Sequence, residues 1–510
     1  MTRAGKYQKL PTKWADREKL REKGQFWTPG WVAGAMVRYA IGNGSKLLFD
    51  PAAGRGAFLN ALRSFGAESK GVQFYGTDID SAVLDDAVYR APGNLVEKRD
   101  FIHNPPTASF DSIVANPPYI RHHRLSAGTK AMLQSIARRN LGRSIDGRAG
   151  LHVFFFIQAL ERLAPGGRLA FIMPADTCEG VFSQALWKWV TSKYCLEAVI
   201  SFAPEATPFP GVDTNAMIFM IRRVGALEKL HWIRCGAADS PDLIRLVEAN
   251  FCDRSLPSLE VSKRNLKEAV RTGLSRPAIG SHFRFTLSDF ARVMRGIATG
   301  ANDFFWMTEE RAAALGIPRN MLKSAVGRTR DVSGDSITCN DLRELNERGR
   351  PTLLFSPEAE SLDQFPENVR AYLELGERQG LPGRALIRTR KPWFRMEKRE
   401  IPPFLFAYLG RRNTRFIRNH ADVIPLTGFL CVYPHRYFME RTDELWEILS
   451  APETVHNLSL VGKSYGSGAI KVEPRSLERL PIPDDLIEST GLVPPHSARS
   501  GNPLLPEINP

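Results

Sequence analysis

The sequence lacks several features that define common classes of protein. Its six cysteines include no C-x-x-C pair, so we expect neither a zinc site nor a disulfide framework. No apolar run approaches the ~20 residues that span a bilayer, and the N-terminal stretch "MTRAGKYQKL" lacks the apolar centre of a secretory signal. Scattered thiols are typical of a reducing compartment. We therefore expect a cytoplasmic protein with no metal site and no membrane contact.

Acidic residues are fewer than basic residues, with 55 Asp or Glu and 69 Lys or Arg in a chain of 510 residues. The net charge of +14 favours a polyanionic partner such as nucleic acid. A basic surface that only keeps the protein in solution would fit the same charge. With 43% hydrophobic residues, the chain has ample material for more than one packed core.

Short apolar runs alternate with helical patterns over residues 1–225. Runs such as "KLLFDPA", "FDSIVANPP" and "GRLAFIMP" predict strands, and "LHVFFFIQALERLA" predicts a helix between two of them. This alternation predicts a doubly wound, Rossmann-like α/β sheet. Residues 226–285 have a weaker pattern and predict a connector. Residues 286–488 predict a second, mixed α+β domain, and the proline-rich residues 489–510 predict a disordered tail.

Acidic residues end two successive predicted strands and suggest a ligand pocket. Asp50 ends the strand before "PAAGRGAF", where Gly54 and Gly56 would let the backbone approach a ligand closely. An exposed carboxylate above this turn can pair with a cation. Asp78 ends the next strand, where an acid can hold a ribose diol.

An acid and an aromatic residue, Asp100 and Phe101, follow the third strand and would suit an adenine ring. The sequence has no phosphate-binding G-x-x-x-x-G-K, and acids repel phosphates, so we expect a positively charged nucleoside. S-adenosylmethionine, with its sulfonium, fits this description. A dinucleotide site is the alternative, but Leu59 replaces the third glycine of its fingerprint.

The segment "NPPY", residues 116–119, ends the next predicted strand. The side-chain carbonyl of Asn116 and the backbone carbonyl of Pro117 can accept both hydrogens of one exocyclic amine. Two such acceptors favour electron density at the nitrogen and hence its attack on a methyl sulfonium, without a strong base. Tyr119 can stack on the ring that carries the amine, while Pro117 and Pro118 fix the geometry. A rigid proline turn capped by Asn116 is the structural alternative.

Together these segments resemble the adenine-N6 DNA methyltransferases with the gamma-class order of motifs. "NPPY" resembles the catalytic motif, "DPAAGRGAF", "GTDID" and "RDF" resemble cofactor motifs, and "GQFWTP" resembles the motif that closes over the methionine end of the cofactor. The resemblance implies catalysis by Asn116, Pro117, Pro118 and Tyr119. It implies a cofactor site formed by Phe26, Thr28, Pro29, Asp50, Pro51, Ala52, Gly54, Gly56, Asp78, Ile79, Asp100, Phe101 and Asn116.

The same resemblance extends to the target base. "PFPGVDTNAMIFMIRR" is similar to the motif whose aromatic residue, here Phe209, faces the base opposite Tyr119. A core phenylalanine is the alternative. The family implies that the target adenine is flipped out of the duplex. One departure is that the family often has an Asp-Leu pair before the next helix, whereas Ala149 and Gly150 supply no acid here.

Basic residues mark two segments for DNA contact. Arg121 and Arg124 follow "NPPY" directly, beside His122 and His123, which we interpret as solvated loop residues rather than catalysts. Between residues 384 and 418, 11 Lys or Arg stand against two acids and interleave with aromatic residues. A merely solvated face is the alternative. The DNA-binding candidates are Arg121, Arg124, Arg390, Lys391, Arg395, Arg411 and Arg412.

The sequence thus predicts a site-specific, nucleoid-associated modification enzyme acting on double-stranded DNA, in a restriction–modification or phage-defence context. A separately encoded restriction endonuclease is a candidate partner. Three alternatives stay open. They are an RNA-adenine methyltransferase, a protein-glutamine methyltransferase that uses the same "NPPY" on an amide nitrogen, and a DNA-binding protein that keeps the fold without catalysis.

Overall fold

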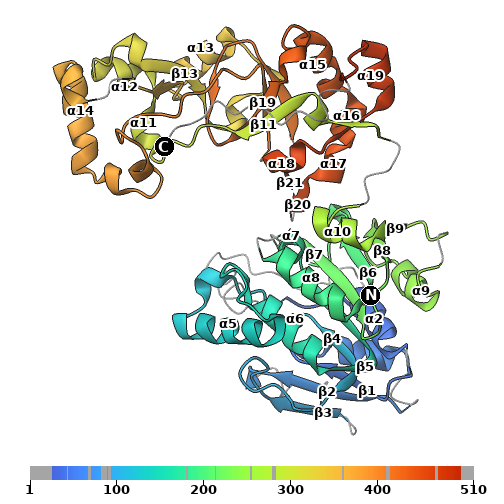
Figure 1. Ribbon diagram of the computed structural model, residues 1–510. Helices are drawn as coiled ribbons and strands as arrows, with labels where there is room; N and C mark the ends of the chain where they lie inside the picture. Colours follow the sequence, from blue (N-terminus) through green and yellow to red (C-terminus); the bar gives the residue numbers. More distant parts are fainter. Residues whose placement is uncertain are drawn as a thin grey trace. The chain divides into compact units, whose positions relative to one another are not determined.

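The computed structural model contains two compact units, which divide the chain near residue 278 (Figure 1). None of the described helices is both long and apolar enough to cross a membrane. The structure describes residues 26–495 apart from 43, 67–70, 82–88, 90–93, 180–181, 213, 253–254, 278–282, 359–360, 409–413 and 466–468.

The first unit is built on a nine-stranded sheet with the order β3-β2-β1-β4-β5-β7-β6-β8-β9. Strands β1 to β5 run parallel to one another, and β7 is antiparallel to both β5 and β6. Central strands such as β7, "AMIFMIR", are apolar almost throughout because both faces of the sheet are covered. The strands are β1 (Leu47–Asp50), β2 (Gln73–Asp78), β3 (Asn94–Lys98), β4 (Phe110–Ala115), β5 (Leu163–Pro174), β6 (Cys195–Phe202), β7 (Ala216–Arg222), β8 (Lys229–Cys235) and β9 (Leu259–Asn265).

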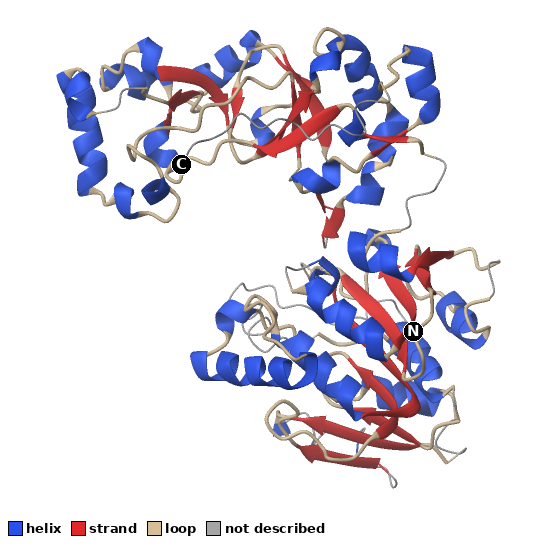
Figure 2. Cartoon of the chain, viewed as in Figure 1, coloured by secondary structure: helices blue, strands red, loops and turns tan. Residues whose placement is uncertain are grey.

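Two separate hydrophobic cores lie against the two faces of this sheet. One core takes residues from α5, α6, α8 and α10, and the other takes residues from α2, α3 and α9. This confirms the predicted doubly wound, Rossmann-like α/β fold, and Figure 2 shows the helices beside the strands. The helices are α2 (Gly30–Ile41), α3 (Ala57–Ser64), α5 (Ala127–Leu141), α6 (Leu151–Arg162), α7 (Asp176–Glu179), α8 (Ser183–Lys193), α9 (Asp242–Glu248) and α10 (Leu266–Thr272).

Residues 226–285 differ from the predicted connector, because they add β8 and β9 to the edge of the sheet. Strand β8 pairs in parallel with β6, and β9 pairs antiparallel with β8. As the outermost strand, β9 ("LEVSKRN") carries several charged side chains, and only Leu259 and Arg264 in it are buried. Its apolar signal is therefore too weak for the sequence pattern to predict a strand.

A buried arginine ties this edge strand to the helix that follows it. The guanidinium of Arg264 donates to Glu268 at 2.9–3.2 Å, to the Thr272 hydroxyl at 2.8 Å and to the Gly273 carbonyl at 3.0 Å. It also donates to the Arg276 carbonyl. One side chain on β9 thus donates to acceptor groups on α10 and in the turn after it.

Replacing Arg264 with leucine is expected to lower the free energy of unfolding by about 3 kcal/mol, because it leaves these acceptors and the Glu268 carboxylate without a hydrogen-bond donor. Chemical denaturation of the full chain, followed by circular dichroism, measures the change. Arg234→Leu is the matched control, since Arg234 and Glu260 form an exposed pair at 3.7 Å. Equal losses in the two variants would contradict the role given to Arg264.

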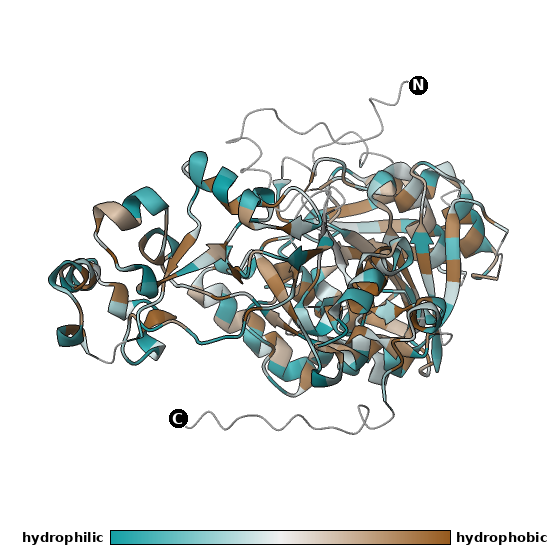
Figure 3. Cartoon of the chain, turned by 90° about the horizontal axis from the view of Figure 1, so that it is seen from above, coloured by the Kyte–Doolittle hydropathy of each residue, from teal (hydrophilic) through white to brown (hydrophobic). Residues whose placement is uncertain are grey.

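The second unit is a mixed α+β domain with two larger sheets, of order β11-β19-β16-β17-β14 and β12-β15-β13-β18. Hydrophobic residues concentrate on the strands and on the inner faces of the helices (Figure 3). The strands are β10 (Phe285–Thr286), β11 (Ala291–Arg295), β12 (Trp306–Met307), β13 (Leu322–Val326), β14 (Ser336–Ile337), β15 (Leu353–Phe355), β16 (Phe404–Ala407), β17 (Arg415–Asn419), β18 (Ile424–Pro425), β19 (Phe429–Pro434), β20 (Lys463–Tyr465), β21 (Ala469–Lys471) and β22 (Pro481–Ile482).

Helices cover these sheets and extend the unit beyond its predicted end. They are α11 (Asn302–Phe305), α12 (Glu309–Ala314), α13 (Cys339–Glu347), α14 (Glu367–Arg378), α15 (Thr442–Ser450), α16 (Pro452–His456), α17 (Leu458–Val461), α18 (Pro474–Leu477) and α19 (Asp484–Thr490). Helix α19 ends inside the predicted tail 489–510, and Leu492 is fully buried. The prediction is therefore wrong for residues 489–495, while residues 496–510 lie outside the described part.

Candidate active site

Three polar side chains meet at one edge of the first sheet. Asp50 ends β1, Asp78 ends β2 and Asn116 follows β4, and the sheet order places β1 between β2 and β4. Because these strands are parallel, their carboxyl ends share an edge, where open α/β sheets bind ligands. The sequence prediction that these residues gather is consistent with this topology.

Asp50 is fully buried, whereas the sequence predicts an exposed carboxylate. Its Oδ1 accepts from the Ala52 amide at 3.1 Å, and its Oδ2 has no partner among the residues that the structure describes. Burial raises the pKa of Asp50 well above its ordinary value; the Ala52 bond opposes this shift and the nearby Asp78 adds to it. A buried acceptor without a partner is costly, so this site favours a cationic group.

Asp78 first organises the glycine-rich turn. Its Oδ2 accepts from the Gly54 amide at 2.9 Å and its Oδ1 from the Asp80 amide at 2.9 Å. Gly54 and Gly56 adopt φ angles of 51° and 73°, in the left-handed region where glycine carries no penalty. A carboxylate can accept about four bonds, so Asp78 keeps acceptor capacity for a ligand hydroxyl. Ile79, 65% exposed, offers apolar surface next to it.

The pair Asp100 and Phe101 does not form the predicted adenine pocket. Asp100 caps its own turn, accepting from the Ile102 and His103 amides at 2.9 and 3.1 Å and pairing with the His103 ring at 2.7 Å. Phe101 is 1% exposed, and its ring packs on Phe49 and Phe155 in the core. The ring turns inward because it covers the apolar face of the sheet, so no face is free for a base.

Asn116 is held by the chain segment before α2. Its Nδ2 donates to the Phe26 carbonyl at 2.6 Å and to the Thr28 hydroxyl at 3.2 Å. Pro29, which precedes α2, follows these two residues directly. The Oδ1 of Asn116 is buried and lacks a hydrogen-bond partner in the described part of the chain. The amide is therefore fixed with its acceptor unused, as the predicted amine contact requires.

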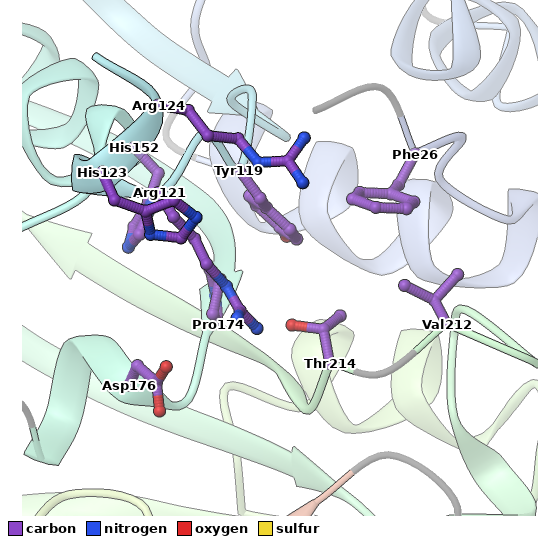
Figure 4. A pocket seen from close by; sticks show the side chains of 10 residues that line it. All are labelled: Phe26, Tyr119, Arg121, His123, Arg124, His152, Pro174, Asp176, Val212 and Thr214. Carbon is purple, nitrogen blue, oxygen red and sulfur yellow. The ribbon is translucent and has the colours of Figure 1, made fainter. Parts of the chain in front are cut away.

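A pocket of about 230 Å³ lies against Phe26, whose carbonyl accepts from this amide, and Figure 4 shows the side chains that line it. The Tyr119 hydroxyl donates to the Ile172 carbonyl at 3.1 Å, which fixes the ring. Burial raises the pKa of Tyr119 well above 10, so the hydroxyl stays a donor. The Phe26 and Tyr119 ring centroids lie 5.6 Å apart. The pocket is lined by Phe26, Tyr119, Arg121, His123, Arg124, His152, Pro174, Asp176, Val212 and Thr214.

Phe209 contacts Tyr119, although the two rings do not face each other as predicted. Their centroids are 6.3 Å apart at an interplanar angle of 80°, and Phe26 touches both rings. Phe209 is only 4% exposed and belongs to a hydrophobic core. Because the rings meet edge to face, the pair does not sandwich a base in this conformation.

His152, in the first turn of α6, is a site residue that the sequence analysis missed. It lines the pocket, and its ring meets Tyr119 edge to face at a centroid distance of 5.9 Å. Burial lowers the pKa of His152 to about 4. The one available signal is a histidine in the otherwise apolar run "LHVFFFI", in the stretch where the acid of the family pattern is missing.

The predicted DNA-binding residues fall into separate groups. Arg121 and Arg124 line the pocket and are exposed. Lys391 is exposed, whereas Arg390 is half-buried, donates to the Ala298 carbonyl at 2.6 Å and lies over Phe305. Arg395 is half-buried. The predicted contacts of Arg411 and Arg412 lie outside the described residues.

Much of the 384–418 segment serves the second unit itself. Arg415 donates to the Val332 and Gly334 carbonyls at 2.6 and 2.8 Å, and Arg418 pairs with Asp443. The aromatic residues that interleave with the charges, Phe394, Phe404 and Phe406, are buried in its cores. Their rings are enclosed in the hydrophobic cores of this unit, and all four residues of β16 are buried, so they present no face to a base.

A solved structure shares this architecture. The type IIL restriction-modification enzyme MmeI, in complex with DNA, superposes with a TM-score of 0.53 at 12% identity. The match covers 92% of this chain and 65% of that longer chain. Sheet order and this likeness together define the first unit as a Rossmann-like α/β domain.

Two relatives extend over almost the whole chain. The type II methyltransferase M.AccI of Acinetobacter calcoaceticus is 24% identical over 474 residues, which cover 91% of this chain and 85% of the relative. The type II methyltransferase M.XamI of Xanthomonas campestris pv. amaranthicola is 26% identical over 482 residues, covering 90% and 85%.

Two family models match consecutive parts of the chain. The model of the Eco57I restriction-modification methylase matches residues 61–209, and the model of the C-terminal domain of type II methyltransferase M.Eco57I matches residues 274–497. The chain therefore belongs to the restriction–modification methyltransferases that carry this C-terminal domain.

Proposed function

We propose that this protein transfers a methyl group from S-adenosylmethionine to the exocyclic N6 amine of an adenine flipped out of duplex DNA. The observation that carries the proposal is the buried, unused Oδ1 of Asn116, whose Nδ2 donates to the carbonyl of Phe26, a residue that lines the pocket together with Tyr119. Membership of a restriction–modification methyltransferase family supports DNA methylation in that context.

In the proposed reaction, the protein positions the target amine and needs no catalytic base. Asn116 Oδ1 and the Pro117 carbonyl accept the two amine hydrogens, which holds the nitrogen in place and favours its lone pair as the nucleophile. When bound, S-adenosylmethionine supplies the methyl group as part of a sulfonium. Tyr119 packs against the ring of the base. The amine proton leaves after the nitrogen is alkylated, so no general base is required.

Residues at the same edge are suited to hold the cofactor. The unpaired Oδ2 of Asp50 would accept from a cationic group, and Asp78 would accept from ribose hydroxyls. Ile79 would pack on the adenine ring in place of Phe101. The segment that contains Phe26 and Thr28 already bonds Asn116, so it connects the cofactor side to the target side.

The second unit is proposed to recognise the DNA sequence, and a separately encoded endonuclease would complete the restriction–modification system. Expression in a bacterial host without adenine methylation, followed by direct sequencing of modified bases, tests the whole proposal. We expect N6-methyladenine at one short sequence motif, and none with the Asn116→Ala variant. Methylated RNA or protein with unmodified DNA would favour the corresponding alternative substrate.

Binding to DNA should weaken steeply with salt, because basic side chains displace counterions from phosphates. We expect log Kd to change linearly with log salt concentration, and Lys391→Gln to reduce the slope by about one. Fluorescence anisotropy with a duplex that contains the mapped site measures both. Lys46→Gln is the matched control, since Lys46 is exposed before β1, at the amino ends of the strands. A flat salt response would contradict phosphate binding by this protein.

A further inference from the structure

One wall of the pocket contains a histidine whose ring nitrogens are unused. His152 is 7% exposed, and neither Nδ1 nor Nε2 has a hydrogen-bond partner within the described ranges. Buried side-chain nitrogens are bonded in the large majority of cases, and an unpaired one carries a free-energy penalty. A histidine that only filled the core would be expected to have at least one such bond.

The chain fixes this imidazole against the catalytic segment. The Leu151 amide donates to the Ile120 carbonyl at 3.0 Å. This bond attaches the start of α6 to the residue that follows Tyr119. A Cβ atom at Gly150 would lie 2.8 and 2.9 Å from Cε1 and Nδ1 of His152, and 3.0 Å from the Ile120 carbonyl. Only glycine therefore fits at position 150 while the ring keeps this place.

The charge state of the His152 ring determines which hydrogen bonds it can form. Burial lowers the pKa of His152 to about 4, and the amino end of a helix also disfavours a cation. The imidazole is thus neutral near pH 7, with one N–H donor and one acceptor nitrogen. The other titratable groups that line the pocket, Arg121, His123, Arg124 and Asp176, are exposed, whereas Tyr119 is committed to Ile172.

On the basis of the proposed function, we propose that His152 is a specificity-determining residue that donates its imidazole N–H to a ring nitrogen of the flipped adenine. Adenine has three unprotonated ring nitrogens, N1, N3 and N7, and a flipped base is recognised by hydrogen bonds to its edges. Asn116 and Pro117 hold the amine, which any aminated base possesses. His152 would add a contact with the ring itself.

A site built around a donor discriminates strongly, because a base without the matching acceptor leaves that donor unpaired. Entry of adenine would satisfy the acceptor of Asn116 and the donor of His152 together. The penalty that both residues carry in the free protein would then be recovered only with the correct base. This accounts for two buried polar groups, at Asn116 and at His152, that lack hydrogen-bond partners in the described part of the chain.

The experiment uses the full-length protein and duplex oligonucleotides that contain the mapped site, with adenine, 1-deazaadenine, 3-deazaadenine or 7-deazaadenine at the target position. His152→Phe keeps the ring contact with Tyr119 but removes both nitrogens. We expect kcat/KM on adenine to fall about tenfold to a hundredfold. We also expect one deaza substrate to slow the natural protein by a similar factor and to show no further loss with His152→Phe.

His152→Gln, which restores a side-chain N–H donor, is expected to recover part of the activity on adenine. This variant also tests the inference if His152→Phe does not fold. His231→Phe is the matched control, since His231 also contacts an aromatic ring, Phe251, but does not line the pocket. Equal losses on all four substrates, or no loss on adenine, would overturn the inference. If the natural protein leaves adenine in DNA unmethylated, the proposed function fails first; activity that is independent of His152 contradicts only this inference.

Discussion

Replacing Asn116 with alanine is expected to lower the rate of methyl transfer by about two to three orders of magnitude, because a preorganised acceptor aimed at the reacting group is lost. The rate is measured as transfer of a labelled methyl group to duplex DNA under saturating cofactor and DNA. We expect most of the loss in kcat, since the contact strengthens as the nitrogen gains positive charge. Affinity for the cofactor should change only several-fold.

Asn419→Ala is the matched control for this experiment. Asn419 is also buried, but its Nδ2 donates to the Pro402 and Val423 carbonyls, at 2.9 and 3.0 Å, and its Oδ1 accepts from the Val423 amide. The control is expected to lower stability and to leave kcat unchanged where the protein stays folded. Unchanged turnover in Asn116→Ala on DNA would refute the proposed mechanism.

Replacing Asp50 with asparagine is expected to weaken binding of S-adenosylmethionine about tenfold to a hundredfold, because a charge-assisted bond to a cationic group is lost. Isothermal titration calorimetry measures the Kd. Burial raises the pKa of Asp50 in the free protein, and a cationic ligand favours the ionised form. Binding to the natural protein should therefore release protons, which titrations in buffers of different ionisation enthalpy detect.

The same substitution should stabilise the free protein at alkaline pH. Because the folded-state pKa of Asp50 is raised, the stabilisation it gives is present below the unfolded-state pKa and is lost as pH rises through the folded-state pKa. Asparagine has no proton to lose and escapes this penalty. Asp78→Asn is the contrasting variant. Because Asp78 accepts from the Gly54 amide, its replacement also disturbs the Gly54 turn. A variant that is less stable at alkaline pH and binds the cofactor normally would contradict our interpretation of Asp50.

The sequence predicted the parts of the site that follow from strand ends. Asp50, Asp78 and Asn116 could be placed together because parallel strands bring their carboxyl ends to one edge. Side-chain direction was not predictable in the same way. Phe101 stands in the right segment, yet its ring enters the core, since neither a turn residue nor a strand period determines the rotamer there.

Edge strands and single polar residues were the weakest points of the prediction. Strand β9 is an edge strand with several charged residues, and it lacks the regular apolar alternation that would predict a strand. His152 carries no motif, and its importance depends on the missing Cβ at Gly150 and on a neighbour that is distant in sequence, Tyr119. The aromatic residues between 384 and 418 belong to the core, which composition alone could not distinguish from a stacking surface.

The two bonds from Asn116 Nδ2 to Phe26 and Thr28 have a consequence for binding affinity. One amide group touches both the segment expected to close over the cofactor and the amine expected to react. Cofactor that orders this segment would also orient the acceptor, and by thermodynamic reciprocity the flipped base would then strengthen cofactor binding by the same factor. We therefore expect positive cooperativity between the two ligands, so that cofactor binds more tightly when an adenine occupies the pocket and the flipped adenine binds more tightly when cofactor is present.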